Sequence, residues 1–401
     1  MNNPEESGIL YLEDLPNKEI FISLNPNFFN KLKIKILNIG KDQFSNIIDV
    51  RETHIRHWLG GGSLIRLDIL LKILKYFNYA NWKNEIEFIR GKLGLKINKP
   101  KIPFNFNSEA GFRIVAGILG DGGIPANRPN PYYSNTNEDL IKSFIEDMKS
   151  VFGDLKYSLR KEKEYRKYSE ITILEFSSLI YKIFLKIGLK AGKKIYTNPK
   201  IPNFVFNGNS KLSFAFISQV IDDEGSVNVK GKHIAITSTV KNIHPNSNLL
   251  VGIKELLLKE KVTSEIYEDN GPPPYIKEDR IRKRLQINGY LQLRGLDNSL
   301  NLRSKSKTKK LKILLKSYSQ IQYPKNRCKE IYLSAMRKIQ EEKGFFTVPD
   351  LTVSVNRDLG HVRNMIHKYH SLDLIKCIEN YKVGKLPEYA KYIINKNENN
   401  S

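Results

Sequence analysis

Two runs of almost continuous apolar residues stand near the middle of the chain, at residues 112–119 and 214–221. Runs of this length without polar interruption predict helices that are buried on all sides. Each run ends at an acid followed by glycine, Asp121-Gly122 in the first and Glu224-Gly225 in the second. Glycine is a common residue at which helices end. Strand-like segments and another helix pattern follow each run, which indicates an internal repeat of roughly a hundred residues.

Apolar and polar residues alternate in several short segments of this repeat, at 155–160, 226–230, 233–239 and 281–288. A period of two predicts strands with one buried and one outward face. Any sheet with one solvated face shows the same alternation, so the pattern alone assigns no function. The outward side chains that it predicts are Lys156, Ser158, Arg160, Ser226, Asn228, Lys230, Thr237, Thr239, Arg282, Arg284 and Gln286.

Prolines at 100, 103 and 324 mark boundaries between helical patterns. They divide the chain into residues 1–100, a central domain at 108–325 with halves 108–205 and 210–325, and residues 326–401. In the first segment, short helices predicted at 43–48 and 53–59 precede an amphipathic one at 64–77. This order resembles a helix-turn-helix of the phage-repressor type, with Arg51, Thr53, His54, Arg56 and His57 on its reading helix. A small helical bundle is the alternative.

The last segment predicts a long helix ending at Gly344, helices at 348–353 and 357–370, and strands at 374–378 and 381–385. That order resembles a winged helix, and the alternative is a module for protein interaction. The side chains that would line its reading helix are Asn356, Arg357, His361, Arg363, Asn364 and Lys368.

Charge makes nucleic acid the expected partner. The chain carries a net charge of +24, and residues 108–325 hold 37 lysines and arginines against 22 acids. Such an excess costs self-repulsion, which a phosphate backbone offsets through counterion release. A lysine-rich proteome would also raise the charge. No apolar run approaches the ~20 residues that span a bilayer, and two cysteines, Cys328 and Cys377, provide no disulfide framework. We therefore expect a cytoplasmic, nucleoid-associated protein without a membrane partner.

The acid that ends each apolar run is the first candidate for chemistry. A helix C-terminus is the negative end of the helix dipole, so a carboxylate there is unfavourable unless a cation shares the site. If the two helix ends meet, two carboxylates and several free carbonyl oxygens converge. This donor set suits Mg²⁺ or Mn²⁺, and two such ions could support phosphodiester hydrolysis. Ala116 and Gly120, four residues apart, would let the helices approach closely.

With these flanking glycines and acids, residues 112–123 and 214–226 resemble the two motifs of single-chain LAGLIDADG homing endonucleases. The resemblance covers about 108–325 and includes the stretches 132–140 and 200–204. It implies metal binding by the side chains of Asp121 and Glu224 and by the backbone carbonyls of Gly120 and Asp223. It also implies that Lys200 and Lys307 order the attacking water, although Lys193, Lys194 and Lys305 compete for this role. Gln219 departs from the family, which usually has a small residue there.

The fold that this resemblance implies is α+β, a pseudo-symmetric pair of αββαββα halves forming a saddle. A helical helix-turn-helix domain and a winged-helix domain would flank it. The polar strand faces would then contact a long, asymmetric site in double-stranded DNA. We expect a monomer, and a free-standing protein rather than an intein, because Met1 is not a nucleophile and the last residues lack a His-Asn pair.

Three functions remain open at this stage. The first is a site-specific, Mg²⁺-dependent double-strand DNA endonuclease. The second is a domesticated transcriptional or chromosome-binding regulator that no longer cleaves, which the DNA-reading patterns at both ends favour. The third is an RNA-splicing maturase, since the same family contains such proteins.

Overall fold

Two buried helices, α6 (Glu109–Leu119) and α11 (Ser210–Glu224), pack against each other in the first of two structural units. The computed structural model describes residues 3–61, 64–92, 94–163, 170–268, 279–318, 328–379 and 389–395. Its contacts divide the chain into residues 1–315 and 316–401. None of the helices in these ranges is both long and apolar enough to cross a bilayer.

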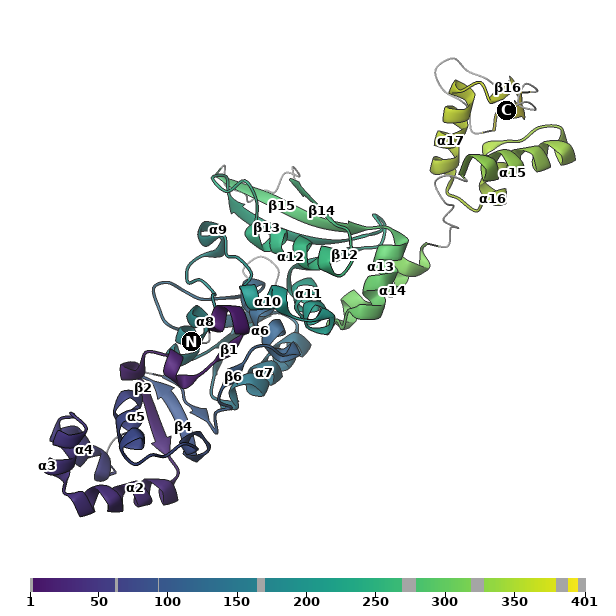
Figure 1. The fold of residues 1–401 in the computed structure, drawn as a ribbon. Helices are drawn as coiled ribbons and strands as arrows, with labels where there is room; N and C mark the ends of the chain where they lie inside the picture. Colours follow the sequence, from purple (N-terminus) through teal and green to yellow (C-terminus); the bar gives the residue numbers. More distant parts are fainter. Residues whose placement is uncertain are drawn as a thin grey trace. The chain divides into compact units, whose positions relative to one another are not determined.

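The element order of the first unit repeats around these two helices (Figure 1). The first half continues from α6 with β7 (Gly122–Gly123), β8 (Tyr132–Asn135), α7 (Glu138–Phe152), β9 (Asp154–Leu155), β10 (Ser158–Lys163), β11 (Glu170–Glu175) and α8 (Ser178–Lys186). The second half continues from α11 with β12 (Gly225–Asn228), β13 (His233–Lys241), α12 (Asn248–Lys259), β14 (Glu265–Glu268), β15 (Arg280–Asn288) and α13 (Tyr290–Ser299). Between the halves lie α9 (Lys194–Thr197) and α10 (Asn203–Asn207), and α14 (Lys305–Lys316) follows the second. Both halves are therefore α+β. The second half has the predicted order αββαββα, and the first half has the same order with β9 as an additional strand.

Each half builds a four-stranded antiparallel sheet with the same topology. The orders are β7-β8-β11-β10 and β12-β13-β15-β14. In the second sheet, Ile234 pairs with Ile287 and Ile236 with Leu285, and all four side chains are buried. The helices α12 and α13 contact this sheet, so its apolar residues form a core while the alternating polar residues face away.

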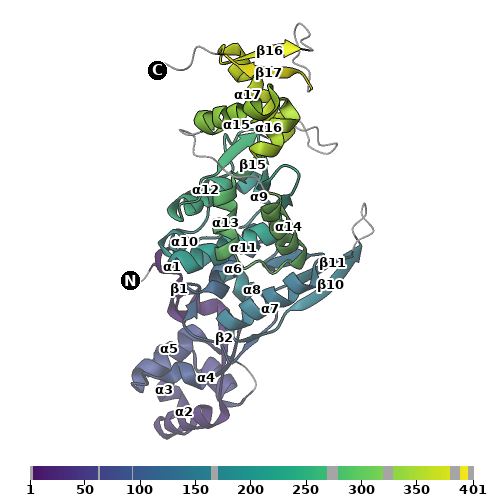
Figure 2. The same cartoon turned by 90° about the vertical axis from the view of Figure 1, so that its right-hand side faces the viewer.

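The segment 155–160, predicted as one strand, is two strands in two different sheets. β9 pairs with β5 (Ile97–Asn98) of the N-terminal region, whereas β10 pairs with β11. Figure 2 shows β10 and β11 projecting away from the helices. Lys156 lies between β9 and β10, outside the sheet that contains β10. The prediction missed this because the alternation of residues 155–160 indicates which side chains are exposed but not which strand each segment pairs with.

The N-terminal region mixes helices and strands, so the prediction of an all-helical domain at 1–100 is wrong. Its sheet has the order β3-β2-β4-β5-β9 and therefore includes a strand of the repeat. The strands before β7, apart from β5, are β1 (Ile9–Leu10), β2 (Ile20–Leu24), β3 (Ile65–Arg66), β4 (Ile86–Gly91) and β6 (Phe104–Asn105). The helices are α1 (Pro4–Ser7), α2 (Pro26–Ile39), α3 (Lys41–Ile47), α4 (Glu52–Leu59) and α5 (Leu67–Tyr76), with 3-10 turns at Leu12–Asp14, Asn17–Glu19 and Trp82–Glu85.

The second unit has its own core, centred on Tyr332, Met336, Phe346 and Tyr392. Its elements are α15 (Cys328–Lys343), α16 (Val348–Ser354), α17 (Leu359–Ser371), β16 (Ile375–Glu379) and β17 (Lys391–Ile394). The two strands pair antiparallel, and a capping box of Thr347 and Asp350 begins α16. The strand predicted at 381–385 lies outside the described residues, and the partner of β16 is β17.

A buried ion pair joins the two halves of the repeat. The guanidinium of Arg303, in the segment before α14, donates to both carboxylate oxygens of Asp147 on α7, at 2.5 and 2.9 Å. Burial raises the pKa of Asp147, although Arg303 opposes the shift. Removing one partner of such a pair leaves an uncompensated charge in the interior.

We therefore expect Arg303→Ala to lower the free energy of unfolding by about 3–5 kcal/mol, because Asp147 loses its partner while it remains buried. Urea denaturation followed by circular dichroism measures this change. Lys305→Ala is the matched control, since Lys305 is 88% exposed and forms a solvated ion pair with Asp139. The control is expected to cost less than about 1 kcal/mol. Equal losses for the two variants would contradict the structural role of Arg303.

Candidate metal site at the junction of two helices

The helices α6 and α11 meet most closely at Gly120 and Asp223. A Cβ atom on Gly120 would lie 2.8 Å from Oδ2 and 2.9 Å from Cβ of Asp223. Because real side chains do not approach this closely, glycine at position 120 permits the contact. The close packing brings the residues after both helices, Asp121 and Gly225, to one region of the first unit.

Asp223 serves the helix contact itself. Its Oδ1 accepts hydrogen bonds from the Tyr133 hydroxyl at 2.8 Å and from Nε2 of Gln219 at 3.0 Å. Burial, together with the charge of Asp121, raises the pKa of Asp223 well above its ordinary value. Gln219, the departure from the resembled family, therefore has a partner across one turn of its own helix. These bonds hold Oδ1 of Asp223 at the helix contact, while its Oδ2 is buried without a hydrogen-bond partner among the described residues.

Asp222 has a different structural task. Its carboxylate accepts from the backbone N–H groups of Arg303 at 2.8 Å and Ser304 at 3.1 Å. These groups stand at the start of α14, where N–H groups lack partners within the helix. Asp222, a residue of α11, thus caps α14 and fixes the position of the first turn of α14, which carries Lys307.

Asp121 and Glu224 are the two acids at this junction that neither task occupies. Asp121 follows α6 and accepts from Nδ2 of Asn135 at 2.7 Å, while the Ser134 hydroxyl donates to its backbone carbonyl at 3.0 Å. Glu224 is the last residue of α11. Burial raises the pKa of both carboxyls, and the negative charge of Asp121 raises that of Glu224 further. Two half-buried acids with raised pKa values indicate a site that favours a cation.

Two lysines approach the acids from opposite halves. Lys194 of α9 donates to the carbonyl of Gly120, and Lys307 of α14 donates to the carbonyls of Ile221 at 2.9 Å and Asp222 at 2.6 Å. Burial lowers the pKa of Lys194 to about 8 and lowers that of Lys307, while the acids oppose both shifts. The charges of the two lysines oppose the rise that burial causes in the pKa of Asp121 and Glu224, and the net shift of both remains upward.

The structure does not bring Lys200, the first-half lysine expected near the metal, to this site. Its side chain is exposed beyond the left-handed turn at Asn198. The first-half lysine whose charge acts on the pKa of Asp121 and Glu224 is Lys194. It precedes Lys200 by nearly the number of residues in two helical turns. Lys307, the second-half candidate, donates to the backbone carbonyls at the end of α11.

A pocket of about 310 Å³ opens beside Glu224. Lys194 and Leu119 line it from one side, and Thr237 and Thr239 of β13 from another. Two of the predicted DNA-contacting threonines therefore share a cavity with one of the acids and a buried lysine. A polar group bound along β13 would be within reach of the helix junction.

The donor set at the junction fits a hard divalent ion. It offers the carboxylates of Asp121 and Glu224 and the carbonyls of Gly120 and Asp223, which are all oxygen atoms. Among the described residues there is no cluster of three or more His, Cys, Asp or Glu side chains that could hold a metal. Two carboxylates leave coordination positions for water and a phosphate oxygen, as Mg²⁺ sites in enzymes commonly do.

The predicted DNA-contacting residues of the second half lie on one sheet face. Thr237 pairs with Arg284 and Thr239 with Arg282, and cross-strand partners point to the same side. Gln286 lies two residues after Arg284 on β15 and therefore on the same face. Asn228 and Lys230 are exposed at the end of β12 and in the turn after it, where Asn228 accepts from the backbone of Gly231.

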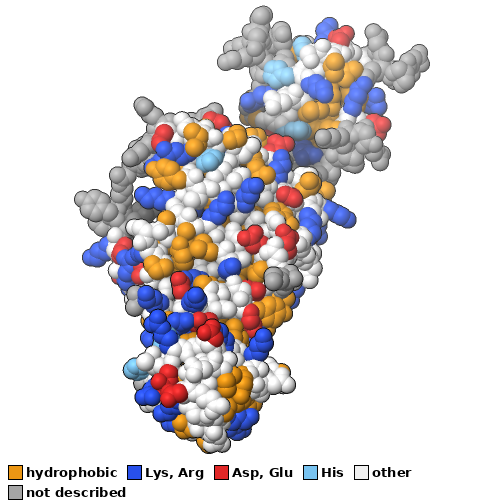
Figure 3. Space-filling model, turned by 60° about the vertical axis from the view of Figure 1, so that its left-hand side comes forward, with side chains coloured by type: hydrophobic (Ala, Val, Ile, Leu, Met, Phe, Trp, Pro, Cys, Tyr) orange, Lys and Arg blue, Asp and Glu red, His pale blue; other side chains and the backbone are white. Residues whose placement is uncertain are grey.

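The first half presents a more acidic face. Ser158 and Arg160 are exposed on β10, but Arg160 forms ion pairs with Glu162 and Glu175, and Arg128 also pairs with Glu175. Lys156 instead follows β9, next to the N-terminal sheet, where its backbone N–H donates to the carbonyl of Lys96. Basic side chains nevertheless spread over much of the face of the first unit drawn in Figure 3.

The flanking residues fall partly on the predicted helices. In the first unit, Thr53, His54, Arg56 and His57 are exposed on α4, Arg51 is its N-cap, and Arg56 pairs with Glu52 and Asp42. In the second unit, His361, Asn364 and Lys368 are exposed on α17 and Arg363 is half-buried there. Asn356 and Arg357 precede α17, because the helix starts only after its N-cap, Asp358.

Sequence reasoning missed several residues that organise this site. Tyr133 and Asn135 lie in a stretch that resembles the family, yet nothing in their spacing showed that they bond the acids. Neither Arg303 nor Asp222 was predicted to organise the site. The available signal was polarity at positions next to buried helices, which does not specify a partner.

Comparison with known proteins gives distant similarities. No protein-family profile matches the chain. The relatives include ribonucleoside-diphosphate reductase NrdEB subunit alpha of Bacillus subtilis (25% identity over 44% of this chain and 16% of the relative). Two others come from Methanocaldococcus jannaschii, a probable translation initiation factor IF-2 (26%, 57% and 18%) and DNA-directed RNA polymerase subunit Rpo1C (27%, 47% and 20%). The chain spans at most a fifth of each relative, and their names share no activity.

Similar solved structures include LAGLIDADG proteins. Full-length DUF199/WhiA from Thermatoga maritima matches with a TM-score of 0.35 and 11% identity, over 68% of this chain and 93% of that one. The homing endonucleases I-DmoI (TM-score 0.32, 15% identity, 48% and 97%) and I-WcaI bound to its DNA recognition sequence (0.34, 14%, 50% and 85%) also match. Scores this low assign neither fold nor activity to this chain, and the case for its function is made by its own residues.

Proposed function

We propose that the protein is a site-specific double-strand DNA endonuclease that depends on Mg²⁺ or Mn²⁺. The observation that carries the proposal is the pair of open carboxylates, Asp121 and Glu224, at the junction of α6 and α11. Burial raises the pKa of all four acids at the junction. Asp222 accepts the N–H groups before α14 and Asp223 holds the helix contact, whereas Asp121 and Glu224 serve neither contact. A cation at the junction would offset that electrostatic cost.

Residues of this chain would prepare the site for phosphodiester hydrolysis. The carboxylates of Asp121 and Glu224 and the carbonyls of Gly120 and Asp223 would hold the ion, which when bound polarises phosphate oxygens and lowers the pKa of water. Asn135 orients the Asp121 carboxylate through its 2.7 Å hydrogen bond. Lys194 and Lys307 position the carbonyls at both helix ends and add positive charge where a phosphate would approach.

The face of β13 and β15 would hold the DNA. Threonine, arginine and glutamine alternate on this face, and such side chains donate to base edges and phosphates. The side chains that β10 presents, including Arg160 with its partners Glu162 and Glu175, differ from those of β13 and β15, so the DNA site would be asymmetric. The exposed residues of α4 and, in the second unit, of α17 would extend the contacts.

A sequence-specific DNA-binding regulator without cleavage is the second candidate. Lys194 and Lys307 already lower the pKa of both acids, so the junction has partial charge compensation without an ion. The exposed α4 and α17 offer additional DNA-reading surfaces. Under this alternative, DNA binding would persist while Mg²⁺ and Mn²⁺ would produce no strand breaks.

We expect Asp121→Asn and Glu224→Gln each to abolish metal-dependent cleavage while DNA affinity stays within about threefold, because each removes a metal ligand without removing a DNA contact. The substrate comes from selection of bound duplexes from a random library. Nicking and double-strand cleavage are followed on gels with Mg²⁺ and with Mn²⁺. Glu255→Gln is the matched control, since Glu255 is an exposed acid on α12, outside the face of β13 and β15, and its variant should cut normally. Normal cutting by both site variants would refute the assignment, and an inactive parent that binds tightly would favour the regulator.

In the absence of divalent ions, Glu224→Gln is expected to raise Tm by about 2–4 °C, as removal of a destabilised functional charge often does. The folded state holds the Glu224 proton more tightly than the unfolded chain, because the carboxyl pKa is raised. The free energy of unfolding therefore falls as pH rises from the ordinary carboxyl range through the raised pKa, and the variant loses part of this slope. Calorimetry with chelator and with Mg²⁺ tests the idea. Mg²⁺ should raise Tm of the parent more than that of Glu224→Gln, and equal shifts would contradict metal binding by this residue.

Lys307→Met is expected to slow single-turnover cleavage by about 10–100-fold, because it releases the carbonyls of Ile221 and Asp222. DNA affinity should change less than about threefold. Lys305→Met is the comparison, because Lys305 is exposed on the same helix and its loss should weaken binding without slowing the bound complex. A purely electrostatic role for Lys307 predicts instead that both variants weaken binding alike.

A further inference from the structure

The N-terminal sheet has one face without a covering layer along much of its length. Ile20, Ile22, Ile89 and Ile97 fill the opposite face and are buried. On the open face, Phe21 pairs with Arg90, and Ser23 pairs with Phe88. The register places the two phenylalanines diagonally on neighbouring strands, both partly exposed.

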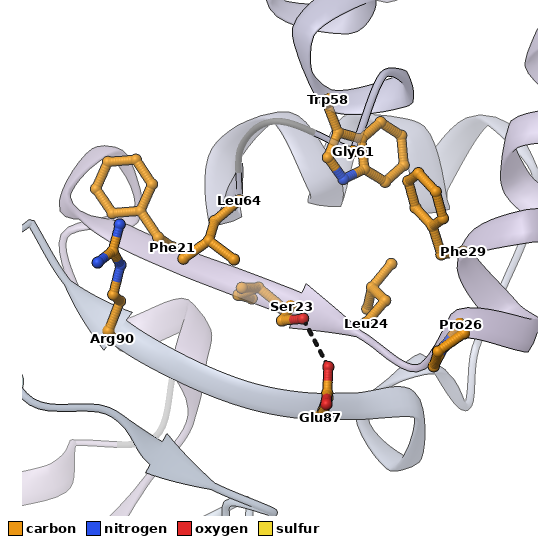
Figure 4. Close-up of a pocket in the computed structure, with 11 residues that line it drawn as sticks. Phe21, Ser23, Leu24, Pro26, Phe29, Trp58, Gly61, Leu64, Glu87 and Arg90 are labelled. Atoms are coloured by element: carbon orange, nitrogen blue, oxygen red, sulfur yellow. Dashed lines mark hydrogen bonds between the residues drawn. The ribbon is translucent and has the colours of Figure 1, made fainter. Parts of the chain in front are cut away.

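Two cavities form a groove along this face. One of about 540 Å³ has Phe21, Phe29 and Trp58 among its walls, and Figure 4 shows Arg90 beside Phe21 at one end of it. The other, of about 510 Å³, is lined by Phe88, Lys96 and Lys156. Leu64 and Arg90 line both cavities, so they adjoin.

The charge of the groove is positive. Among the described residues that line it, Arg90, Lys96 and Lys156 are basic and Glu87 is acidic, and Glu87 accepts a hydrogen bond from Ser23 at 2.9 Å. Lys96 lies over the ring of Phe88, with Nζ 4.5 Å from the centroid. Aromatic planes next to cations suit a ligand that combines flat rings with regularly spaced negative charge.

We propose that this groove binds single-stranded nucleic acid, with bases stacked on Phe21 and Phe88 and phosphates near Arg90, Lys96 and Lys156. Bases in a duplex hide their faces in the helical stack, so a duplex could use only the cations. A peptide would use the apolar walls but gains little from the three cations unless it is acidic. The combination of rings and cations therefore favours an unpaired strand.

The groove is also continuous along the chain with the proposed DNA surface. The backbone N–H of Lys156 donates to the carbonyl of Lys96 at 3.0 Å, and two residues later the chain enters β10. An unpaired strand that leaves the first half of the repeat would meet Lys156 first. The proposed site is on the N-terminal sheet, whereas Asp121 follows α6 and Glu224 ends α11, and it does not depend on cleavage.

The test uses the full chain with Glu224→Gln, which prevents cutting, and fluorescence anisotropy. The probes are labelled single strands of about twelve thymidines or uridines and a hairpin duplex of similar length. Phe21→Ala and Phe88→Ala should each weaken single-strand binding by about tenfold, because one stacked base is lost, whereas Phe88→Tyr should retain it. Duplex affinity should stay within about twofold. The two single strands distinguish a DNA ligand from an RNA ligand.

Lys96→Glu is a second variant that cannot disturb the core, because Lys96 is exposed. It should weaken single-strand binding about fivefold or more, whereas Lys31→Glu on the exposed side of α2 should not. Ile34→Ala, also exposed on α2, controls for loss of apolar surface. Unchanged single-strand affinity in Phe21→Ala and Phe88→Ala would overturn the proposal. Parallel losses for single strands and duplex would also overturn it, since they would indicate general phosphate binding.

Discussion

The close approach of α6 and α11 at Gly120 is the constraint on which the rest of the first unit depends. It sets both helix C-termini side by side, and each terminus carries free carbonyls and a nearby acid. Left alone, such an arrangement concentrates negative charge in a poorly solvated place. Lys194 of α9 and Lys307 of α14 offset this charge, because their ammonium groups donate to the carbonyls at the helix ends.

The four acids at the junction divide into two kinds by their partners. Asp222 and Asp223 are bonded to backbone N–H groups, a tyrosine and a glutamine, and they maintain the architecture. Asp121 accepts from the side chain of Asn135, and Asp121 and Glu224 take part in neither of these two contacts. Sequence position alone would not separate Asp223 from Glu224, since both end the same helix. Packing separates them, because only one of two consecutive helical residues can point into the partner helix.

The sequence allowed the central repeat and the two junction acids to be predicted, because long apolar runs and alternation report directly on burial. It did not allow the partners to be predicted. Lys194, and not Lys200, lies at the junction, because α9 places Lys194 where it donates to Gly120. No local sequence pattern predicts the course of the chain at α9. The N-terminal strands were missed for a related reason: β3 and β5 are two residues each and gain their stability from neighbours distant in sequence.

The pairing of β5 with β9 has a consequence for modularity. The repeat contributes β9 to the N-terminal sheet, so the first hundred residues alone do not contain all the strands of this sheet. Cutting the chain before α6 would expose the hydrogen-bonding edge of β9 and remove the outer partner of β5, and bare edges of this kind recruit other strands. The N-terminal region and the repeat therefore have to be inherited, expressed and exchanged as a single piece.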